Sequence, residues 1–306
     1  MNAKVAVVGS TNWDMSMRLP SLPAPGETVL GGAGYFCLGG KGANQAIAAA
    51  RAGGEVFFLS CVGEDAIAAE VRKELSANGL DLYGVTTIEA TDTGSAMIFV
   101  DERGENCIGV ASGANAYLTA DIVARHAGAI KTADILLLQM EIPPATVEAA
   151  ARSHDRVILN PAPAQKLSKA LLSEVSILTP NKIELAQVTG AKPDDENALK
   201  NAAQCILEQG PEAVLITLGA EGVFAVTSQE TFRLPAFSVE AVDTTGAGDV
   251  FNGGLAVALA GGASLREATE FGMAAAALSV QKNGAIPSIP YKAEIENLLN
   301  QHSPLL

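Results

Sequence analysis

Six near-continuous apolar runs recur along the 306-residue chain and alternate with alanine-rich segments of helical length. Such runs are typical of parallel strands covered by helices on both faces, because neither face of the strand then meets water. The alternation therefore predicts an open, mostly parallel sheet with helices on both sides. The strands are expected in VAVVGS, VFFLSCVG, ILLLQME, RVILNPA, SILTPN and AVLITLG, and helices over Asn44–Ala52, Ala66–Asn78, Pro144–Ser153, Asn197–Gln209 and Ala293–Leu306.

Two stretches break this alternation. The first, DMSMRLPSLPAPGETVLGGAGYFC, has no helical period and carries three prolines and four glycines. The second predicts a β-hairpin of Ser95–Val100 and Cys107–Val110, turning through Asp101–Asn106. Together they predict a small antiparallel lid over the ligand edge, with two surface ribbons of no function as the alternative. The expected division is a core of residues 1–11, 37–94 and 111–306 and a β-sheet lid of residues 12–36 and 95–110.

Charge and cysteine usage exclude several classes of protein. The net charge is −14, which argues against sequence-independent nucleic-acid binding and against anionic membrane surfaces. No apolar run approaches the roughly 20 residues that a membrane helix needs. The four cysteines are far apart in the sequence, so a reducing, cytoplasmic location without metal-binding or redox cysteine pairs is expected.

The stretch VDTTGAGDVFNGG, Val242 to Gly254, is the strongest local signal of chemistry. Its glycines predict a tight turn, and the apolar residues that follow predict a helix with Asp249 in the first turn. A glycine turn at a helix N-terminus points backbone N–H groups at one spot and so favours an anion. A carboxylate beside an anion site would repel the anion, and this conflict suggests that Asp249 has a function.

Other polar residues fall at the expected carboxyl edge of the sheet, where open α/β sheets bind ligands. GGKGANQAIAAARAG is not a phosphate-binding P-loop, because Gly42 follows Lys41 and Tyr35 stands where the motif needs glycine. It instead predicts a glycine turn that opens a helix at Asn44. Asn12 and Asp14 alternate along an extended segment and suit vicinal hydroxyls, although an Asx turn is the simpler reading. The same edge gathers Glu141, Asn181, Glu184 and the turn Thr217–Gly222.

Two of these motifs, GGKGANQA and DTTGAGDVFNGG, resemble the signatures of the ribokinase-like (PfkB) carbohydrate kinases. PAPGETV, SGAN, LNPAPA and ITLG also occur in the family's order, so the resemblance spans essentially the whole chain. It implies a three-layer α/β/α fold with a β lid, ATP-dependent phosphorylation of a sugar hydroxyl, Mg²⁺ and K⁺ as cofactors, and a homodimer joined through the lid. D-ribose, converted to D-ribose 5-phosphate, is the acceptor it most directly implies. Deoxyribose, fructose or a related sugar, a nucleoside, and a non-catalytic sugar-binding role are the alternatives.

The resemblance also implies a role for each matching residue. Asp249 corresponds to the general base and the backbone of Gly246, Ala247 and Gly248 to the anion hole. The sugar would contact Asn12, Asp14, Gly40, Lys41, Asn44, Glu141 and Asp249. ATP would contact Asn181, Thr217, Leu218, Gly219, Ala220, Glu221, Gly222, Gly248 and Met273. Glu184 would organise Mg²⁺ through water, and K⁺ would lie among Asp243, Thr245, Ser279, Lys282, Gly284 and Ser288. The family has a small residue where this chain has Trp13, which either packs under the lid or reshapes the sugar pocket.

Overall fold

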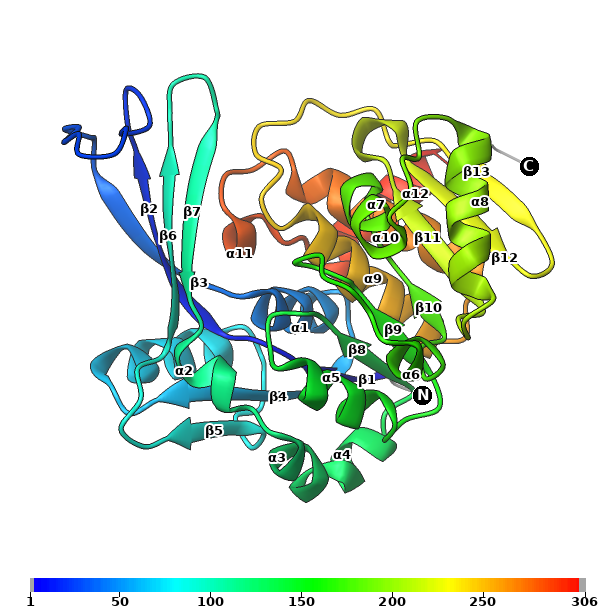
Figure 1. Cartoon of the computed structure of the whole chain (residues 1–306), viewed down its shortest axis with the longest axis horizontal. Helices are drawn as coiled ribbons and strands as arrows, with labels where there is room; N and C mark the ends of the chain where they lie inside the picture. The colour runs from blue at the N-terminus through cyan, green and yellow to red at the C-terminus, as the bar shows by residue number, and fades with distance from the viewer. Residues whose placement is uncertain (1–2, 303–306) are drawn as a thin grey trace.

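A nine-stranded sheet forms the centre of the protein in the computed structural model, which describes residues 3–302. Its strand order is β13-β12-β11-β10-β9-β8-β1-β4-β5, and all neighbours run parallel except β11–β12 and β12–β13. The mostly parallel sheet predicted from the sequence is confirmed (Figure 1). The strands are β1 Lys4–Val8, β4 Glu55–Gly63, β5 Val85–Ile88, β8 Ile135–Leu138, β9 Val157–Leu159, β10 Ile177–Leu178, β11 Ala213–Thr217, β12 Val223–Thr227 and β13 Thr231–Leu234.

Helices cover both faces of this sheet because alternate strand residues point to opposite sides. In β1, Val5 and Val7 enter one apolar cluster and Ala6 and Val8 enter the other. Helices with residues in the first cluster are α1 Lys41–Arg51, α2 Ala66–Ala77, α9 Ala247–Ala260, α10 Leu265–Ser279, α11 Ala285–Ser288 and α12 Lys292–His302. Helices with residues in the second are η1 Gly113–Tyr117, α3 Ala120–Arg125, α4 Ala127–Lys131, α5 Pro144–Ala151, α6 Lys169–Leu172, α7 Lys182–Thr189 and α8 Glu196–Leu207. The three-layer α/β/α architecture is therefore confirmed.

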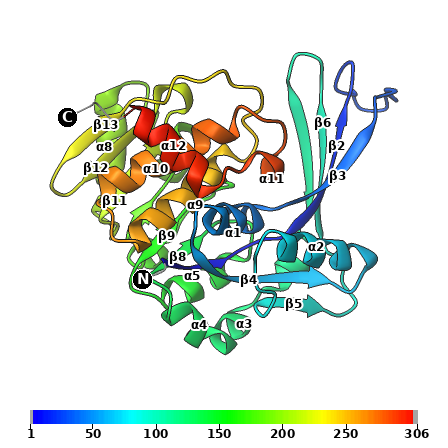
Figure 2. The ribbon, with the colours of Figure 1, turned by 180° about the vertical axis from the view of Figure 1, so that it is seen from behind.

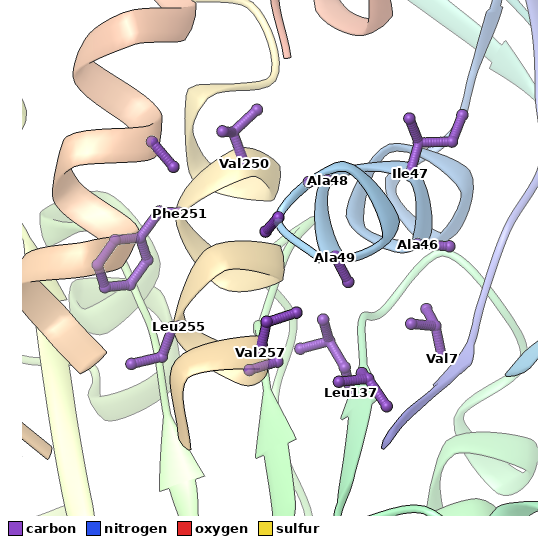
Figure 3. Packing of buried hydrophobic residues seen from close by; sticks show 14 of the residues in the cluster. Val7, Ala46, Ile47, Ala48, Ala49, Leu137, Val250, Phe251, Leu255 and Val257 are labelled. Carbon is purple, nitrogen blue, oxygen red and sulfur yellow. The ribbon is translucent and has the colours of Figure 1, made fainter. Parts of the chain in front are cut away.

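Helices α1 and α9 cross at close range on the first face. Figure 3 shows Ala48 and Ala49 of α1 beside α9, while Phe251 of α9 points toward the neighbouring helix. The approach depends on Gly253, where an added Cβ would lie 2.5 Å from Ala48 Cβ and 2.8 Å from the Ala49 nitrogen. Small residues on both helices thus set the distance between two elements that carry predicted site residues.

Gly253→Ala is expected to destabilise the protein by about 1–3 kcal/mol, because the backbone of α1 must shift to admit the methyl group. Urea denaturation measures this change. Gly128→Ala in α4 is the matched control, since an added Cβ there meets nothing within 4 Å. The control should be neutral or slightly stabilising, as alanine has the higher helix propensity. Equal stability of the two variants would refute the tight crossing.

A second, four-stranded sheet projects away from the central one (Figures 1 and 2). Its order is β3-β2-β6-β7, with bounds β2 Asn12–Arg18, β3 Gly34–Gly39, β6 Gly94–Val100 and β7 Asn106–Ala111. The β6–β7 hairpin predicted from the sequence is confirmed. Two of the three strand pairs are antiparallel, whereas β2 and β6 run parallel, with Asn12 opposite Gly94.

Asn115 fixes the base of this small sheet where β1 passes into β2. Its Oδ1 accepts from the Thr11 backbone N–H at 2.8 Å, and its Nδ2 donates to the Thr11 carbonyl at 3.1 Å and to Asn12 Oδ1 at 2.8 Å. All three atoms belong to residues that are nearly inaccessible to solvent. The chain therefore leaves the central sheet through a buried, hydrogen-bonded junction.

Most predicted helices agree with the structure to within two residues at each described end. The exception in the site region is α1, which begins at Lys41 rather than at the predicted Asn44, because Gly40 at φ 86° completes the turn earlier. The C-terminal helix α12 runs Lys292–His302, and the rest of its predicted range lies outside the described residues. Within residues 3–302 no helix has the length and apolar character needed to cross a bilayer.

Candidate active site

Asp249 lies in the first turn of α9, as the sequence predicts. Gly246 forms the N-cap in the left-handed region at φ 75°, and Ala247 is the first helical residue. Asp249 is 5% exposed, and each of its carboxylate oxygens accepts one side-chain amide. Asn44 Nδ2 donates to Oδ2 and Gln45 Nε2 donates to Oδ1, both at 2.9 Å. The glycine turn and the carboxylate therefore share one helix N-terminus, and α1 supplies the donors that fix the carboxylate.

A cavity of about 180 Å³ opens over this helix terminus. It gathers residues that the sequence analysis had placed at one edge, although they come from segments far apart in the chain: Lys41, Asn181, Glu184, Thr217, Gly246, Ala247, Gly248 and Asp249. Five lining residues were missed: Asn160, Ala162, Thr179, Thr244 and Asn252. Asn160 and Thr179 directly follow β9 and β10, so the position of a polar residue at a strand end could have identified them.

Lys41 brings positive charge to a largely acidic cavity. The charge of Asp249 raises the pKa of Lys41 above its ordinary value, burial opposes this, and Glu141 and Glu184 reinforce it. Burial raises the pKa of Glu184, while the Asn181 N–H and Lys41 lower it. A protonated lysine among three carboxyl groups can hold a phosphate group that the carboxylates alone would repel.

Glu141 joins α1 to the first strand of the central sheet. Its Oε2 accepts from Ser10 Oγ at 2.6 Å and from the Lys41 backbone N–H at 2.9 Å, while Ser10 Oγ accepts from Gly42 N–H at 3.2 Å. A carboxylate at the N-terminus of α1 also has a favourable interaction with the helix dipole. Glu141 thus fixes the start of the helix that carries Lys41 and Asn44.

A second cavity of about 400 Å³ lies between Glu141 and the small sheet. Of the predicted sugar-binding residues, Asn12 and Glu141 line it, and Val110 of β7 contributes an apolar wall. The remaining lining residues are Ser112, Asn115, Ala116, Met140, Ile142, Pro143, Pro144, Pro163 and Gln165. The small sheet and the segment that follows β8 therefore contribute side chains to one cavity.

Asp14 is a half-buried carboxyl group on β2 beside Gly39, where an added Cβ would lie 2.0 Å from Asp14 Oδ2. Burial, reinforced by the charge of Glu141, raises the pKa of Asp14 from 3.8 to about 7 against a lowering hydrogen bond from the Ala96 backbone. Asp14 Oδ1 and Asn44 Oδ1 are both buried and accept no hydrogen bond from the described residues. Hydroxyl groups of a ligand are donors that would satisfy such atoms.

Trp13, between Asn12 and Asp14, alternates to the other face of β2. It is partly buried and packs against the apolar cluster that contains α1 and α9. Of the two roles left open by the sequence, packing beneath the small sheet is the one this contact supports.

Asn181 and Glu184 form a capping box at the start of α7. Asn181 Oδ1 accepts from Glu184 N–H, and Glu184 Oε2 accepts from Asn181 N–H, each at 2.8 Å. Among the described residues, Asn181 Nδ2 and Glu184 Oε1 make no further hydrogen bond, so each residue keeps one polar atom for a ligand. Residues 3–302 contain no cluster of three or more His, Cys, Asp or Glu arranged to hold a metal ion. A divalent ion would therefore depend on ligand oxygens and water as well as on Glu184.

Two of the residues predicted to hold a monovalent cation, Thr245 and Gly284, form hydrogen bonds with a third, Asp243. Its Oδ1 accepts from Thr245 N–H at 2.9 Å and from Thr245 Oγ1 at 2.6 Å, and its Oδ2 accepts from Gly284 N–H at 2.8 Å. Burial alone would raise the pKa of Asp243, but these hydrogen bonds outweigh it and leave the pKa below its ordinary value. The ionised carboxylate thus ties the loop before α9 to the loop before α11.

Several predicted residues do not line either cavity. Met273 is 7% exposed and packs in the core, Lys282 pairs with Glu294 at 3.3 Å, and Ser279 Oγ donates to the Ala276 carbonyl. Ser288 Oγ donates to the Ala285 carbonyl, and Gly40 serves as the N-cap of α1. The turn of Leu218, Gly219, Ala220, Glu221 and Gly222 contains the short helix η2 Gly219–Glu221, in which Glu221 pairs with Arg233. For these residues the predicted ligand contacts stay predictions.

Known proteins place this architecture in a family. The model of the pfkB family carbohydrate kinases matches residues 2–292. The chain belongs to the pfkB family. It is 43% identical over 298 residues to a ribokinase of Haemophilus influenzae, with 96% of this chain and 97% of that protein covered.

Two solved ribokinase structures have the same fold. A ribokinase from Thermotoga maritima superposes with a TM-score of 0.90 at 38% identity, covering 97% of this chain and 99% of that one. An Arabidopsis thaliana ribokinase complexed with ribose and ATP gives a TM-score of 0.89 at 32% identity, covering 98% and 99%. As a carbohydrate kinase, the protein is a phosphotransferase with an alcohol acceptor.

Proposed function

We propose that the protein transfers the γ-phosphoryl group of ATP to D-ribose and forms D-ribose 5-phosphate. The observation that carries this proposal is Asp249, a buried carboxylate fixed by two amides in the first turn after Gly246 and facing a cavity that contains Lys41. The similarity to ribokinases over nearly the whole chain supports ribose as the acceptor.

Asp249 acts as the general base in this proposal. The acceptor hydroxyl donates to the carboxylate, which orients it toward phosphorus and takes its proton as the new P–O bond forms. The backbone N–H groups at the start of α9 stabilise negative charge on the transferring group, since they are fixed before the reaction begins. Lys41, which lines the same cavity, adds a positive charge. Phosphoryl transfer needs mainly positioning and electrostatic stabilisation, which these groups supply.

The first cavity would hold the phosphates of ATP, and the second would hold the sugar. Asn181, Thr217 and Gly248 are the predicted nucleotide contacts that line the first cavity. Mg²⁺, when bound with the nucleotide, would neutralise phosphate charge, and the free oxygen of Glu184 suits one of its water ligands. On the sugar side, the orphaned oxygens of Asp14 and Asn44 and the wall formed by Asn12 and Glu141 suit a polyhydroxylated acceptor.

The small sheet is proposed to act as a lid and as the contact between two copies of the chain. Its strands expose large apolar side chains, which the pairing register distributes over both faces of the sheet. They are Tyr35, Phe36, Met97, Ile108 and Val110. A homodimer through this sheet would cover part of this surface. The expected cytoplasmic location is part of the same proposal, and all four cysteines carry free thiols.

Release of ADP, measured with MgATP against a panel of pentoses and hexoses, tests the proposed acceptor. D-ribose should give the highest kcat/KM, with deoxyribose and fructose below it. A higher value for another sugar would replace ribose as the acceptor but leave the kinase activity intact. Binding of sugar without turnover of any panel member would instead favour a non-catalytic role.

Potassium is expected to raise kcat above the value in sodium at equal ionic strength. The ionised Asp243 lies in the loop that leads into α9, and its hydrogen bond with Gly284 joins this loop to the one before α11. A cation bound there would rigidify the loop preceding Ala247. Steady-state rates in KCl and NaCl at saturating ATP and sugar measure the effect. Identical rates in both salts would remove the cation from the proposal.

A further inference from the structure

Gln45 is a fully buried amide that contacts the carboxylate of Asp249. Its Nε2 donates at 2.9 Å to Asp249 Oδ1 and at 3.2 Å to Asn160 Oδ1, which accounts for both of its hydrogens. Its Oε1 accepts at 2.7 Å from Gln139 Nε2. All hydrogen-bonding groups of the Gln45 side chain are thus engaged, with one N–H directed at the carboxylate of Asp249 and the other at Asn160.

Gln139, directly after β8, is also fully buried and does not contact Asp249 through a hydrogen bond. Its Oε1 accepts no hydrogen bond from the described residues. Gly9 makes room for this amide, because a Cβ at Gly9 would lie 2.0 Å from Gln139 Oε1. A buried acceptor without a donor destabilises the fold, so its retention calls for a physical reason.

The orientation of both amides follows from the charge of Asp249. If Gln45 were flipped, its oxygen would face the carboxylate oxygen, and two acceptors cannot form a hydrogen bond. With Gln45 Nε2 toward Asp249, its oxygen faces Gln139, which must then present its nitrogen. Gln139 therefore holds Gln45 in the one orientation that donates to Asp249.

We propose that Gln45 and Gln139 are positioning residues that hold the carboxylate of Asp249 in the rotamer needed for proton abstraction. This inference rests on the proposed role of Asp249 as the base. With Asn44 on one oxygen and Gln45 on the other, rotation of the carboxylate breaks at least one hydrogen bond to a charged group. Asp249 lines the first cavity, where the other charged groups that face it are Lys41 and Glu184.

The substitutions Gln45→Met and Gln139→Met test this chain of contacts. Gln45→Met should lower kcat by roughly 10- to 100-fold, the usual effect of losing a hydrogen bond to a charged group, with KM for ATP nearly unchanged. The acidic limb of its pH–rate profile should move to higher pH, because a carboxylate that loses a donor binds its proton more readily. Gln139→Met should shift kcat and the acidic limb in the same direction by a smaller amount. It removes the orphaned Oε1 of Gln139 but leaves Gln45 Oε1 without its donor, so the number of buried oxygens without a donor is unchanged and stability should change little.

The double variant distinguishes positioning from general damage to the core. Because Gln139 acts through Gln45, the double variant should have the kcat of Gln45→Met alone. Thr146→Val is the control, because it removes a different buried hydrogen bond, the one from Thr146 Oγ1 to the Leu118 carbonyl. It should leave the pH profile unchanged. Additive losses, or lower kcat with an unmoved acidic limb, would overturn the inference. Full activity of Asp249→Asn would instead refute the proposed base, so the two failures are distinguishable.

Discussion

Asp249→Asn is expected to lower kcat by roughly 10²- to 10⁴-fold, the range that loss of a general base commonly produces. An asparagine keeps the size of the side chain but cannot accept the proton of the acceptor hydroxyl. ATP affinity should change little, because the variant retains the N–H groups at the start of α9 and the predicted nucleotide contact Asn181. Steady-state ADP release gives kcat, and calorimetric titration gives the affinity for ATP.

Asp195→Asn is the matched control for this change. Asp195 caps α8, where its Oδ1 accepts from the Ala198 N–H at 2.8 Å, and asparagine is an equally good N-cap. The control should have unchanged kcat and stability. Near-normal turnover in a folded Asp249→Asn protein would remove Asp249 from the mechanism.

Asp14→Asn is expected to raise the KM for the sugar by roughly 10- to 150-fold and at the same time to stabilise the free protein above neutral pH. The first effect follows from the loss of a charged hydrogen-bond acceptor for sugar hydroxyls. The second follows from the pKa of Asp14, which burial raises from 3.8 to about 7. The protonated form is favoured in the folded protein, so the contribution of Asp14 to stability is full below 3.8 and declines as the pH rises. It is lost once the pH passes about 7.

Thermal melts at pH 5 and pH 8 measure the stability effect. The variant should gain on the parent between these values, and each kcal/mol of gain raises Tm by roughly 2–4 °C in a chain of this size. In the parent protein, KM for the sugar should rise as the pH falls below about 7, because the acceptor site becomes protonated. An unchanged KM for the sugar in the variant would show that Asp14 does not bind the sugar. The same Tm difference from the parent at both pH values would show that burial does not raise the pKa of Asp14.

The sequence predicted the layers of the fold and the position of Asp249 because both depend on local patterns. Continuous apolar runs specify strands that are buried on both faces, and a glycine turn before an apolar segment specifies a helix N-terminus. The parallel pairing of β2 with β6 was not predictable, since it joins Asn12 to Gly94 across some eighty residues and no local pattern encodes such register.

The polar contacts behind Asp249 were missed for a related reason. Gln45 follows Asn44 near the start of an alanine-rich helix, and Gln139 follows the apolar residues of ILLLQME, so neither stands out in the sequence. Their role depends on the meeting of α1, β8 and α9, which only the fold determines. A glutamine that interrupts an otherwise buried run is nevertheless a usable signal, because burial requires that its amide find partners.

The small sheet forms part of the wall of the second cavity, and this has a consequence for how the enzyme could be redesigned. The groups assigned to phosphoryl transfer lie on α1 and α9, which are locked together at Gly253, whereas Asn12, Asp14 and Val110 belong to strands of the small sheet. Substitutions on these strands alter the shape of the acceptor cavity without entering the α1–α9 contact. Acceptor preference can therefore diversify by changes in one module while the reaction chemistry is inherited unchanged from the other.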